Sequence, residues 1–222
     1  MKIIVIFTKK DSMAYISHLD LQRLLLRSFR MAGVRPLYSS GFNPHPKMSI
    51  ALPLSLGISS NREYCEADIP AETLPEGLTE RLNAILPQGI KVRDIRPKRE
   101  DIKRSIASYV RSASYEIIAP RFEGAAESIN SCLEQRTFLI MKKSVKTGKE
   151  EQRDIRGQII RLSIIREFNE QMMLEAVLSA GSGGTLNPLV FIRSFYEFSR
   201  LDLDEDRLSI LRTGINFDRK LF

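Results

Sequence analysis

The chain has 222 residues, of which 43% are hydrophobic, and carries a formal net charge of +7 from 34 basic and 27 acidic residues. This length and apolar content suffice for one large core or two small ones, which excludes a largely disordered chain. The sequence contains no apolar run near the roughly 20 residues that span a bilayer, and its opening MKIIVIFTKK is charged too early for a signal peptide. We therefore expect a cytoplasmic protein with no membrane partner.

Hydrophobic periodicity predicts the element order βαββαβ over residues 1–96. Strands are expected at 2–8, 48–56, 63–69 and 90–95, and helices after Ser17 and over 75–86. The strand at 48–56 contains Pro53, which favours an edge position, and a turn is expected at 59–61. This order is typical of the ferredoxin-like unit, in which two helices cover one face of a four-stranded antiparallel sheet.

A charged, proline-containing connector is expected at 97–112, and the same element order then recurs over 113–222. Strands are predicted at 114–119, 137–143, 172–178 and 207–212, and helices at 123–134 and 188–198. The second unit contains an insertion at about 144–169, which begins as an exposed loop and continues as IIRLSII, a strand or a helix. The predicted fold class is therefore α+β, with two ferredoxin-like halves.

The helix that follows Ser17 has one apolar and one basic face. Ser17 and Asp20 have the spacing of a capping box, and Gly33 is placed to end the helix in the left-handed conformation. At about 100° per residue, Leu21, Leu25, Phe29 and Ala32 fall on one side, and Arg23, Arg27 and Arg30 on the other. One face is expected to pack and the other to present a row of guanidinium groups.

Positive charge is concentrated near the start of the chain. Residues 1–60 contain eight basic and two acidic residues, a net charge of +6. Clustered cations attract polyanions by releasing counterions, so this charge and the sequence pI near 9.5 agree with a nucleic-acid surface. A solvated basic face on an ordinary protein is the alternative.

The loop Gly41 to Lys47 has the sequence GFNPHPK. Pro44 and Pro46 fix their own φ angles and push the residues before them into extended conformations, so the loop is expected to be stiff. We predict that it lies on the surface, with His45 and Lys47 reaching the same groove as the helix arginines.

Three segments, SHLDLQRLLLRSFRMAG, YSSGFNPHPKMSIALPLSLG and REYCEADI, resemble the radical-SAM-associated, or radical-SAM-linked, protein family. This bacterial family is encoded beside, or fused to, radical S-adenosylmethionine proteins. The resemblance is dense over about the first 70 residues and implies a partnership with such an enzyme rather than a reaction. The chain lacks the Cys-x-x-x-Cys-x-x-Cys motif that holds the iron–sulfur cluster of radical enzymes, so it would act as an accessory protein.

The preferred hypothesis is RNA binding in support of RNA modification, without a cofactor. Aromatic rings stack on unpaired bases, and cations follow the phosphate backbone. The predicted nucleic-acid-binding residues are Arg23, Arg27, Arg30, Phe42, Asn43, His45 and Lys47, with Tyr38 as a second stacking ring. Gly181, Gly183 and Gly184 precede a helix with Asn187 as N-cap and Pro188 at its first position, where free amides can receive a phosphate. A connector that tolerates positive φ is the alternative for that loop.

Two other function classes stay open. His18, Tyr38, His45 and Lys47 are residue types that metal-free RNA cleavage uses, which makes a metal-independent endoribonuclease one alternative. The alternative to catalysis is a structural role for both histidines, in which His18 packs at the helix start and His45 holds the loop by hydrogen bonds. A protein-interaction adaptor without nucleic-acid contact is the other alternative. Two histidines without further ligand motifs do not predict a metal site. Cys65 and Cys132 are expected to be small buried hydrophobes rather than a disulfide.

Overall fold

The computed structural model describes residues 1–71, 73–143, 148 and 150–222, and four α-helices occur among them. The α+β class predicted from the sequence is confirmed. The chain divides into two compact units: unit 1 comprises Met1–Arg111 and Arg212–Phe222, and unit 2 comprises Ser112–Leu211. Most of the predicted connector therefore belongs to unit 1, and the last strand, β10 (Ser209–Phe217), contributes residues to both units.

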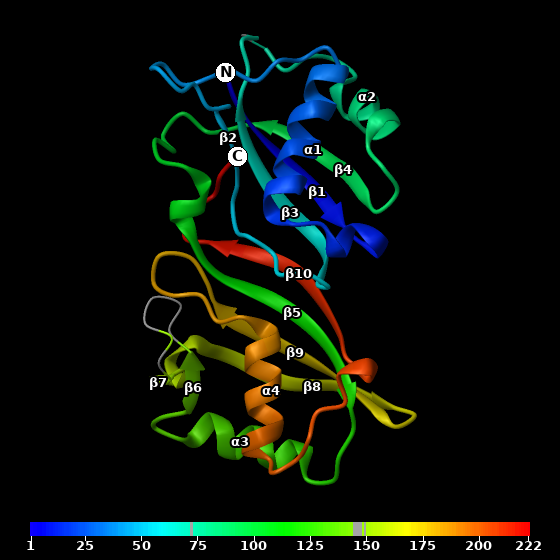
Figure 1. Cartoon of the computed structure of the whole chain (residues 1–222), viewed down its shortest axis with the longest axis vertical. Coiled ribbons are helices and arrows are strands. Elements are labelled where there is room, and N and C mark those ends of the chain that lie inside the picture. Colours follow the sequence, from blue (N-terminus) through cyan, green and yellow to red (C-terminus); the bar gives the residue numbers. More distant parts are fainter. Residues whose placement is uncertain (72, 144–147, 149) are drawn as a thin grey trace. The chain divides into compact units, whose positions relative to one another are not determined.

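Unit 1 contains a sheet with two helices on one face (Figure 1). Its strands are β1 (Lys2–Lys9), β2 (Met48–Ile50), β3 (Ser59–Asp68) and β4 (Ile90–Pro97), and its helices are α1 (His18–Met31) and α2 (Leu78–Ile85). The strand order is β4-β1-β3, with β2 also on β3, and these pairs are antiparallel. Residues 212–217 of β10 follow β3 in the same sheet.

The apolar run of β1 explains why this strand is central. Seven of its eight residues are buried, as expected for a strand covered on both faces. Ile3, Val5 and Phe7 pack in one core cluster with the apolar stripes of α1 and α2. Ile4 and Ile6 alternate with them and therefore lie on the other face of the sheet.

The structure corrects two details of this region. The strand predicted at 48–56 ends at Ile50 because the carbonyl oxygens of Leu52 and Pro53 accept hydrogen bonds from the Arg212 guanidinium, at 2.9 and 3.3 Å, instead of joining a ladder. The turn expected at 59–61 is part of β3, which starts at Ser59.

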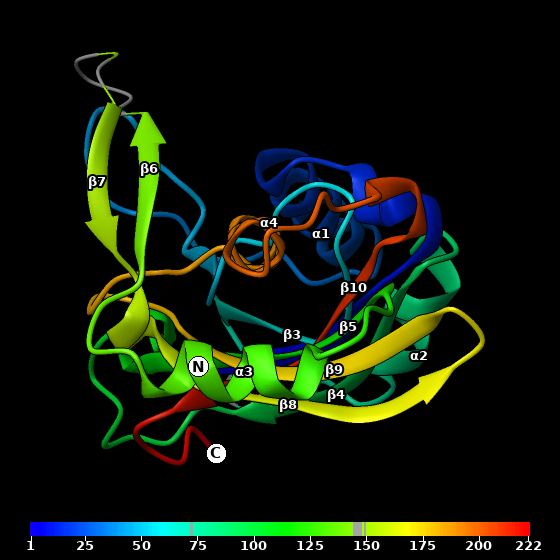
Figure 2. The ribbon, with the colours of Figure 1, turned by 90° about the horizontal axis from the view of Figure 1, so that it is seen from below.

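Unit 2 contains a sheet region with the antiparallel order β5-β9-β8. Its strands are β5 (Val110–Pro120), which enters the unit at Ser112, β8 (Ile159–Phe168) and β9 (Gln171–Ser179), and its helices are α3 (Ala125–Glu134) and α4 (Pro188–Phe198). Strands β6 (Leu139–Lys143) and β7 (Glu150–Asp154) form a two-stranded sheet that stands away from it (Figure 2). Short 3₁₀ helices occupy Asp11–Tyr15, Ile106–Tyr109, Arg156–Gln158 and Glu205–Arg207.

The insertion differs from its predicted form. The strand predicted at 137–143 pairs only with β7, while the ambiguous IIRLSII segment is the main-sheet strand β8. Residues 144–147 and 149 of the expected exposed loop lie outside the described residues. In the described part of the chain the longest helix, α1, has 14 residues, and no helix has the length and apolarity to span a membrane.

Candidate nucleic-acid interface

Helix α1 has the cap and the two faces predicted from its sequence. The Ser17 hydroxyl accepts the Asp20 backbone N–H at 3.1 Å and lies 2.6 Å from Asp20 Oδ2, to which it donates. The hydrogen bond from the Ser17 hydroxyl is the main cause of a lowered pKa of Asp20, and the neighbouring Arg23 lowers this pKa further. The core residues are Leu21, Leu25 and Phe29, and the exposed ones are Arg23, Arg27 and Arg30.

The loop between α1 and β2 is held by its own backbone. Lys47 N–H donates to the Leu37 carbonyl at 2.7 Å, and Ser39 N–H donates to the His45 carbonyl at 2.8 Å. Asp68 of β3 bonds to both sides of the loop, accepting from Leu37 N–H at 2.7 Å and donating to the Lys47 carbonyl at 2.9 Å. The loop is therefore ordered without a ligand, through these hydrogen bonds as well as its prolines.

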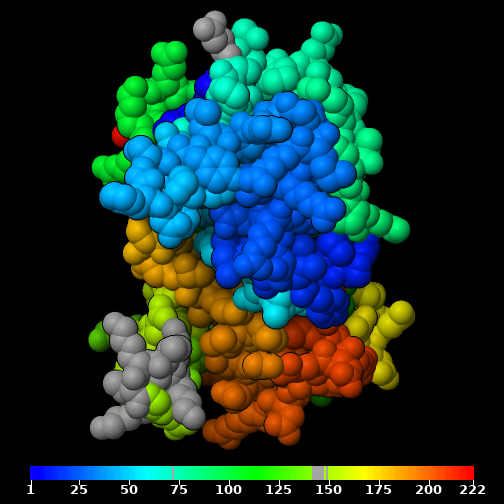
Figure 3. Space-filling view, turned by 45° about the horizontal axis from the view of Figure 1, so that its top comes forward, coloured from blue at the N-terminus to red at the C-terminus, as the bar shows by residue number. Residues whose placement is uncertain are grey.

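A groove runs between α1 and this loop, whose surfaces are seen in blue and lighter blue in Figure 3. Its volume is about 460 Å³. We call it the α1 groove; it is lined by Leu19, Gln22, Arg23, Leu26, His45, Pro46 and Met48. The Gln22 side-chain amide donates to the Met48 carbonyl at 2.9 Å, which joins its two walls. Apolar side chains thus combine with one guanidinium and one imidazole.

The structure brings together only part of the predicted set. Arg23 and His45 line the α1 groove, but Lys47 lines a different depression with Lys2 and Glu66, so the prediction of a shared groove was wrong for Lys47. Arg27 is exposed and has no hydrogen-bond or ion-pair partner among the described residues. Arg23 forms an exposed ion pair with Asp20 at 3.1 Å.

Tyr38 contacts Arg30 of α1 rather than either histidine. Arg30 donates a hydrogen bond to the Tyr38 hydroxyl, and its guanidinium carbon lies 5.9 Å from the ring centroid. His18 is half-buried at the first position of α1. Neither the α1 groove nor the depression at Lys47 brings the four candidate catalytic residues together.

Phe42 and Asn43 are at the tip of the loop. The Phe42 side chain is fully exposed, and Asn43 is exposed as well. Gly41 supports this tip with a φ of 125°, a conformation that residues with a Cβ rarely adopt. An exposed ring on an ordered loop can stack on an unpaired base at little entropic cost.

The glycine loop of unit 2 uses two of its three predicted amide donors internally. Gly181 N–H donates to the Thr185 hydroxyl at 3.1 Å, and Gly184 N–H to the Gly181 carbonyl at 3.2 Å. Gly181 and Gly184 both have positive φ. Gly183, the third glycine, is exposed to solvent. Asn187 caps α4 through a 2.8 Å bond from Leu189 N–H, as predicted. This geometry supports the connector interpretation better than a phosphate site.

The sequence did not predict two buried ion pairs made by β3. Glu63 binds Arg212, and Glu66 binds Lys98 at 3.0 Å. Lys9 is buried beside the first pair and donates to the Ala14 carbonyl at 2.9 Å; burial lowers its pKa. The only signal in the sequence was that Glu63 and Glu66 flank Tyr64 and Cys65 within a predicted strand. Part of the signature REYCEADI therefore serves the fold.

Both cysteines are buried and free, as expected. Burial raises the pKa of Cys65 to about 12 and that of Cys132 to about 11, which makes their thiolates scarce at neutral pH. No three histidine, cysteine or carboxylate side chains in the described ranges are grouped so that they could hold a metal ion.

Together these features define an α+β protein with an exposed basic helix face beside an ordered loop and a shallow groove. The family model described as "Uncharacterized protein conserved in bacteria (DUF2344)" matches residues 2–188, so the chain belongs to that family. The description names no partner enzyme, and the association with radical S-adenosylmethionine proteins stays a prediction.

Solved structures give distant similarities. One is to a chain of a Cbf5-Nop10-Gar1 complex, with 9% identity, a TM-score of 0.48, and coverage of 95% of this chain and 48% of the other. Another is to the archaeal box H/ACA sRNP Nop10-Cbf5 complex, with 10% identity, a TM-score of 0.44, and coverage of 97% and 49%. The chain thus spans about half the length of these two matches, and similarity this low carries no functional argument. No curated protein matches the sequence.

Proposed function

We propose that this protein binds single-stranded RNA across α1 and the loop at 37–48, and presents it to a radical S-adenosylmethionine enzyme that modifies RNA. The observation that carries the proposal is the α1 groove, which Arg23 and His45 line together with apolar side chains, and whose loop also presents the exposed ring of Phe42. Single-strand binders combine cations that follow the backbone with rings that stack on bases, and this surface offers both.

Charge supports a polyanionic ligand. Arg23, Arg27 and Arg30 are exposed on the same helix, and the first 60 residues carry eight basic against two acidic side chains. Because the loop is tied to β3 by two backbone hydrogen bonds at Asp68, and to itself by others, binding does not have to order it first. Affinity should therefore depend strongly on salt.

The element order supports the finer description of the fold as two ferredoxin-like halves. In unit 1 the order βαββαβ occurs with β1 between β4 and β3, and β2 on β3. In unit 2, β5, α3, β8, β9 and α4 follow the same order once the β6–β7 hairpin is counted as the insertion. We propose this assignment on topology.

The accessory role rests on the resemblance of the first 70 residues to the radical-SAM-associated family and on the missing cluster motif. A docking surface for such a partner would also explain exposed apolar side chains near α1. Tyr15 is 72% exposed and Leu56 is 61% exposed. The Tyr15 ring lies beside Gly57, the neighbour of Leu56, because a Cβ added to Gly57 would be 3.6 Å from Tyr15 Cε1. These residues favour the adaptor as the second candidate function. The endoribonuclease has no such support, because neither the α1 groove nor the depression at Lys47 gathers its residues.

Ultraviolet crosslinking in cells, followed by sequencing of the attached RNA and mass spectrometry of the crosslinked peptides, tests the proposal. We expect RNA above the level of uncrosslinked cells, with crosslinks on peptides from α1 or residues 37–48. Recovery of a partner protein without RNA would instead support the adaptor.

A further inference from the structure

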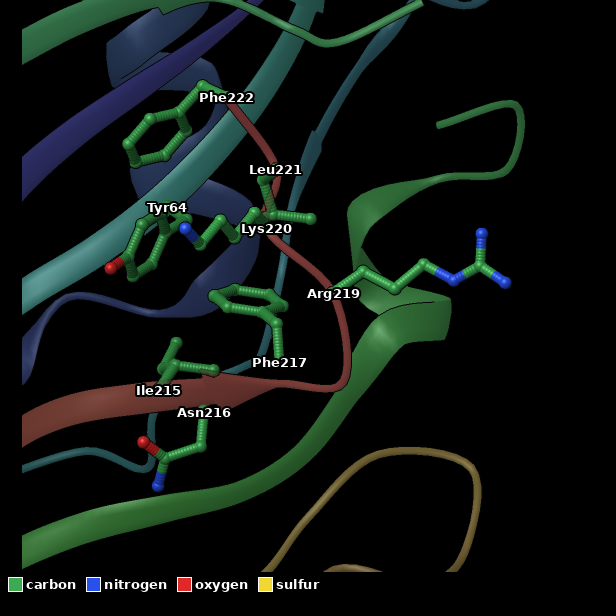
Figure 4. A pocket seen from close by; sticks show the side chains of 8 residues that line it. All are labelled: Tyr64, Ile215, Asn216, Phe217, Arg219, Lys220, Leu221 and Phe222. Carbon is green, nitrogen blue, oxygen red and sulfur yellow. The ribbon is translucent and has the colours of Figure 1, made fainter. Parts of the chain in front are cut away.

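Unit 1 has a second cavity, on the sheet face opposite to α1 and α2. Cys65 packs in the core beneath the helices, so strand alternation places its neighbour Tyr64 on the other face. The cavity is lined by Tyr64 and by residues 215–217 and 219–222, from the end of β10 and the tail behind it (Figure 4). We call it the tail pocket. Its volume of about 370 Å³ is within the range of small-molecule sites.

Aromatic rings form the walls of the tail pocket. The centroids of Tyr64 and Phe217 are 5.0 Å apart, and their planes meet at 82°, so the two rings make perpendicular walls. Guanidinium groups lie against two of the rings: Arg62 is 5.7 Å from the Tyr64 centroid, and Arg96 is 4.9 Å from that of Phe222.

The tail pocket also has an uncommitted cation. Lys220 extends toward Tyr64, whereas Arg219 extends away from it (Figure 4). The nearby carboxylates are already paired: Asp218 binds Arg111, and Asp94 binds Arg96 at 2.5 Å. Lys220 has no hydrogen-bond or ion-pair partner within the described ranges.

The tail is held in place without a ligand. The Leu221 carbonyl accepts Arg99 N–H at 3.0 Å, and Asp218 N–H donates to the Tyr109 carbonyl at 3.0 Å. Leu221 is buried between these contacts. Since the walls are already ordered, a ligand does not have to fix the tail.

We propose that the tail pocket binds a planar heteroaromatic ring that carries a phosphate, the chemistry of a nucleotide. The rings supply stacking surfaces for the heterocycle, and Lys220 supplies the charge for the phosphate. A bare inorganic anion would leave the aromatic walls unused, and a neutral ring would leave the ammonium unpaired. The proposal does not depend on RNA binding at α1, and the nucleotide is either free or one unit of an RNA strand.

Calorimetric titration of the full chain with AMP, GMP, CMP and UMP, and with a single-stranded ten-nucleotide RNA, tests the proposal. Phe217→Leu should weaken binding about tenfold, the loss expected for one stacking ring. Lys220→Gln should weaken it several-fold and reduce the salt slope by about one. Lys91→Gln, which removes an exposed lysine from β4, is the charge control and should bind normally. Circular dichroism of each variant establishes that it is folded; Lys220 is exposed, so its variant keeps the test valid even if Phe217→Leu is unstable.

Binding of a mononucleotide that Lys220→Gln weakens would identify a free-nucleotide site. Binding of the RNA alone, with the same dependence on Lys220, would make the tail pocket a second contact for the strand. If the wild type binds neither probe, or if neither variant changes binding, the tail pocket is not a nucleotide site. RNA binding that depends on Arg23 but not on Lys220, without mononucleotide binding, would overturn this inference and leave the proposed function intact.

Discussion

Arg212 in β10 and Glu63 in β3 form an ion pair whose side chains are each only 1% exposed. The guanidinium Nε lies 2.8 Å from Glu63 Oε1, and the same group donates to the carbonyls of Leu52 and Pro53. One buried cation therefore joins the C-terminal strand of unit 1 to the loop after β2. Removal of the anion would leave that cation uncompensated.

We expect Glu63→Gln to lower the free energy of unfolding by about 3–5 kcal/mol, the usual cost of breaking a buried pair. Chemical denaturation measures this change. Glu100→Gln, at an exposed carboxylate of the connector, is the matched control and should have little effect. The double variant Glu63→Leu with Arg212→Met should recover much of the loss, because neither partner of the pair is left without the other. Equal stability of Glu63→Gln and the wild type would show that the pair does not hold the fold.

The buried thiol of Cys65 gives a pH dependence. Its pKa is raised from an ordinary 9.0 to about 12, so the folded state retains a proton that the unfolded state loses. The stability associated with this group is complete below about pH 9 and falls as the pH rises toward 12. Cys65→Ala should make the alkaline decline of the free energy of unfolding shallower. Parallel pH profiles for both proteins would contradict this expectation.

How far the sequence predicts the fold depends on whether the signals are local. Helix α1 starts after Ser17 and α4 starts at Pro188, as predicted, because the caps lie in adjacent residues. The early end of β2 was not predictable, because the Arg212 guanidinium that holds the following loop lies 160 residues further along the chain. Likewise, no local pattern shows that β6 pairs with β7 instead of joining the main sheet.

The candidate site was predictable to a similar degree. Helical phase placed the arginines on one exposed face, and the prolines correctly indicated an ordered surface loop. The position of Lys47 could not be predicted from the sequence. Its backbone hydrogen bonds to Leu37 and Asp68 fix it beside β3, where it lines a depression other than the α1 groove. The tail pocket combines Tyr64 with residues about 150 positions later, and that proximity appears only in the fold.

Phe42 offers a test of stacking that leaves the core untouched. Because its ring is fully exposed, Phe42→Ala should not change the unfolding midpoint. It should weaken single-stranded RNA binding by about 1–3 kcal/mol, the contribution of one stacked base. Fluorescence anisotropy with labelled RNA measures the change, and Leu56→Ala removes another exposed apolar side chain as a control. Equal losses in the two variants would indicate a general apolar surface rather than a base contact.

We expect the protein to bind RNA without cutting it. Since neither the α1 groove nor the depression at Lys47 gathers His18, Tyr38, His45 and Lys47, prolonged incubation in EDTA should return the RNA whole. His45→Ala should weaken binding, because the imidazole lines the α1 groove. Products ending in 2′,3′-cyclic phosphate that disappear in His45→Ala or His18→Ala would establish the endoribonuclease instead.

The salt dependence of RNA binding tests the central claim most directly. Replacing Arg23, Arg27 and Arg30 together by Gln should weaken binding of single-stranded RNA and reduce the slope of log K against log salt by up to about two, at roughly 0.7 per phosphate contact. A variant with Lys91, Arg93 and Lys103 replaced by Gln loses the same charge at exposed positions outside α1, and should keep both the affinity and most of the slope. If the two triple variants behave alike, or if the arginine variant binds as the wild type does, α1 is not the RNA surface.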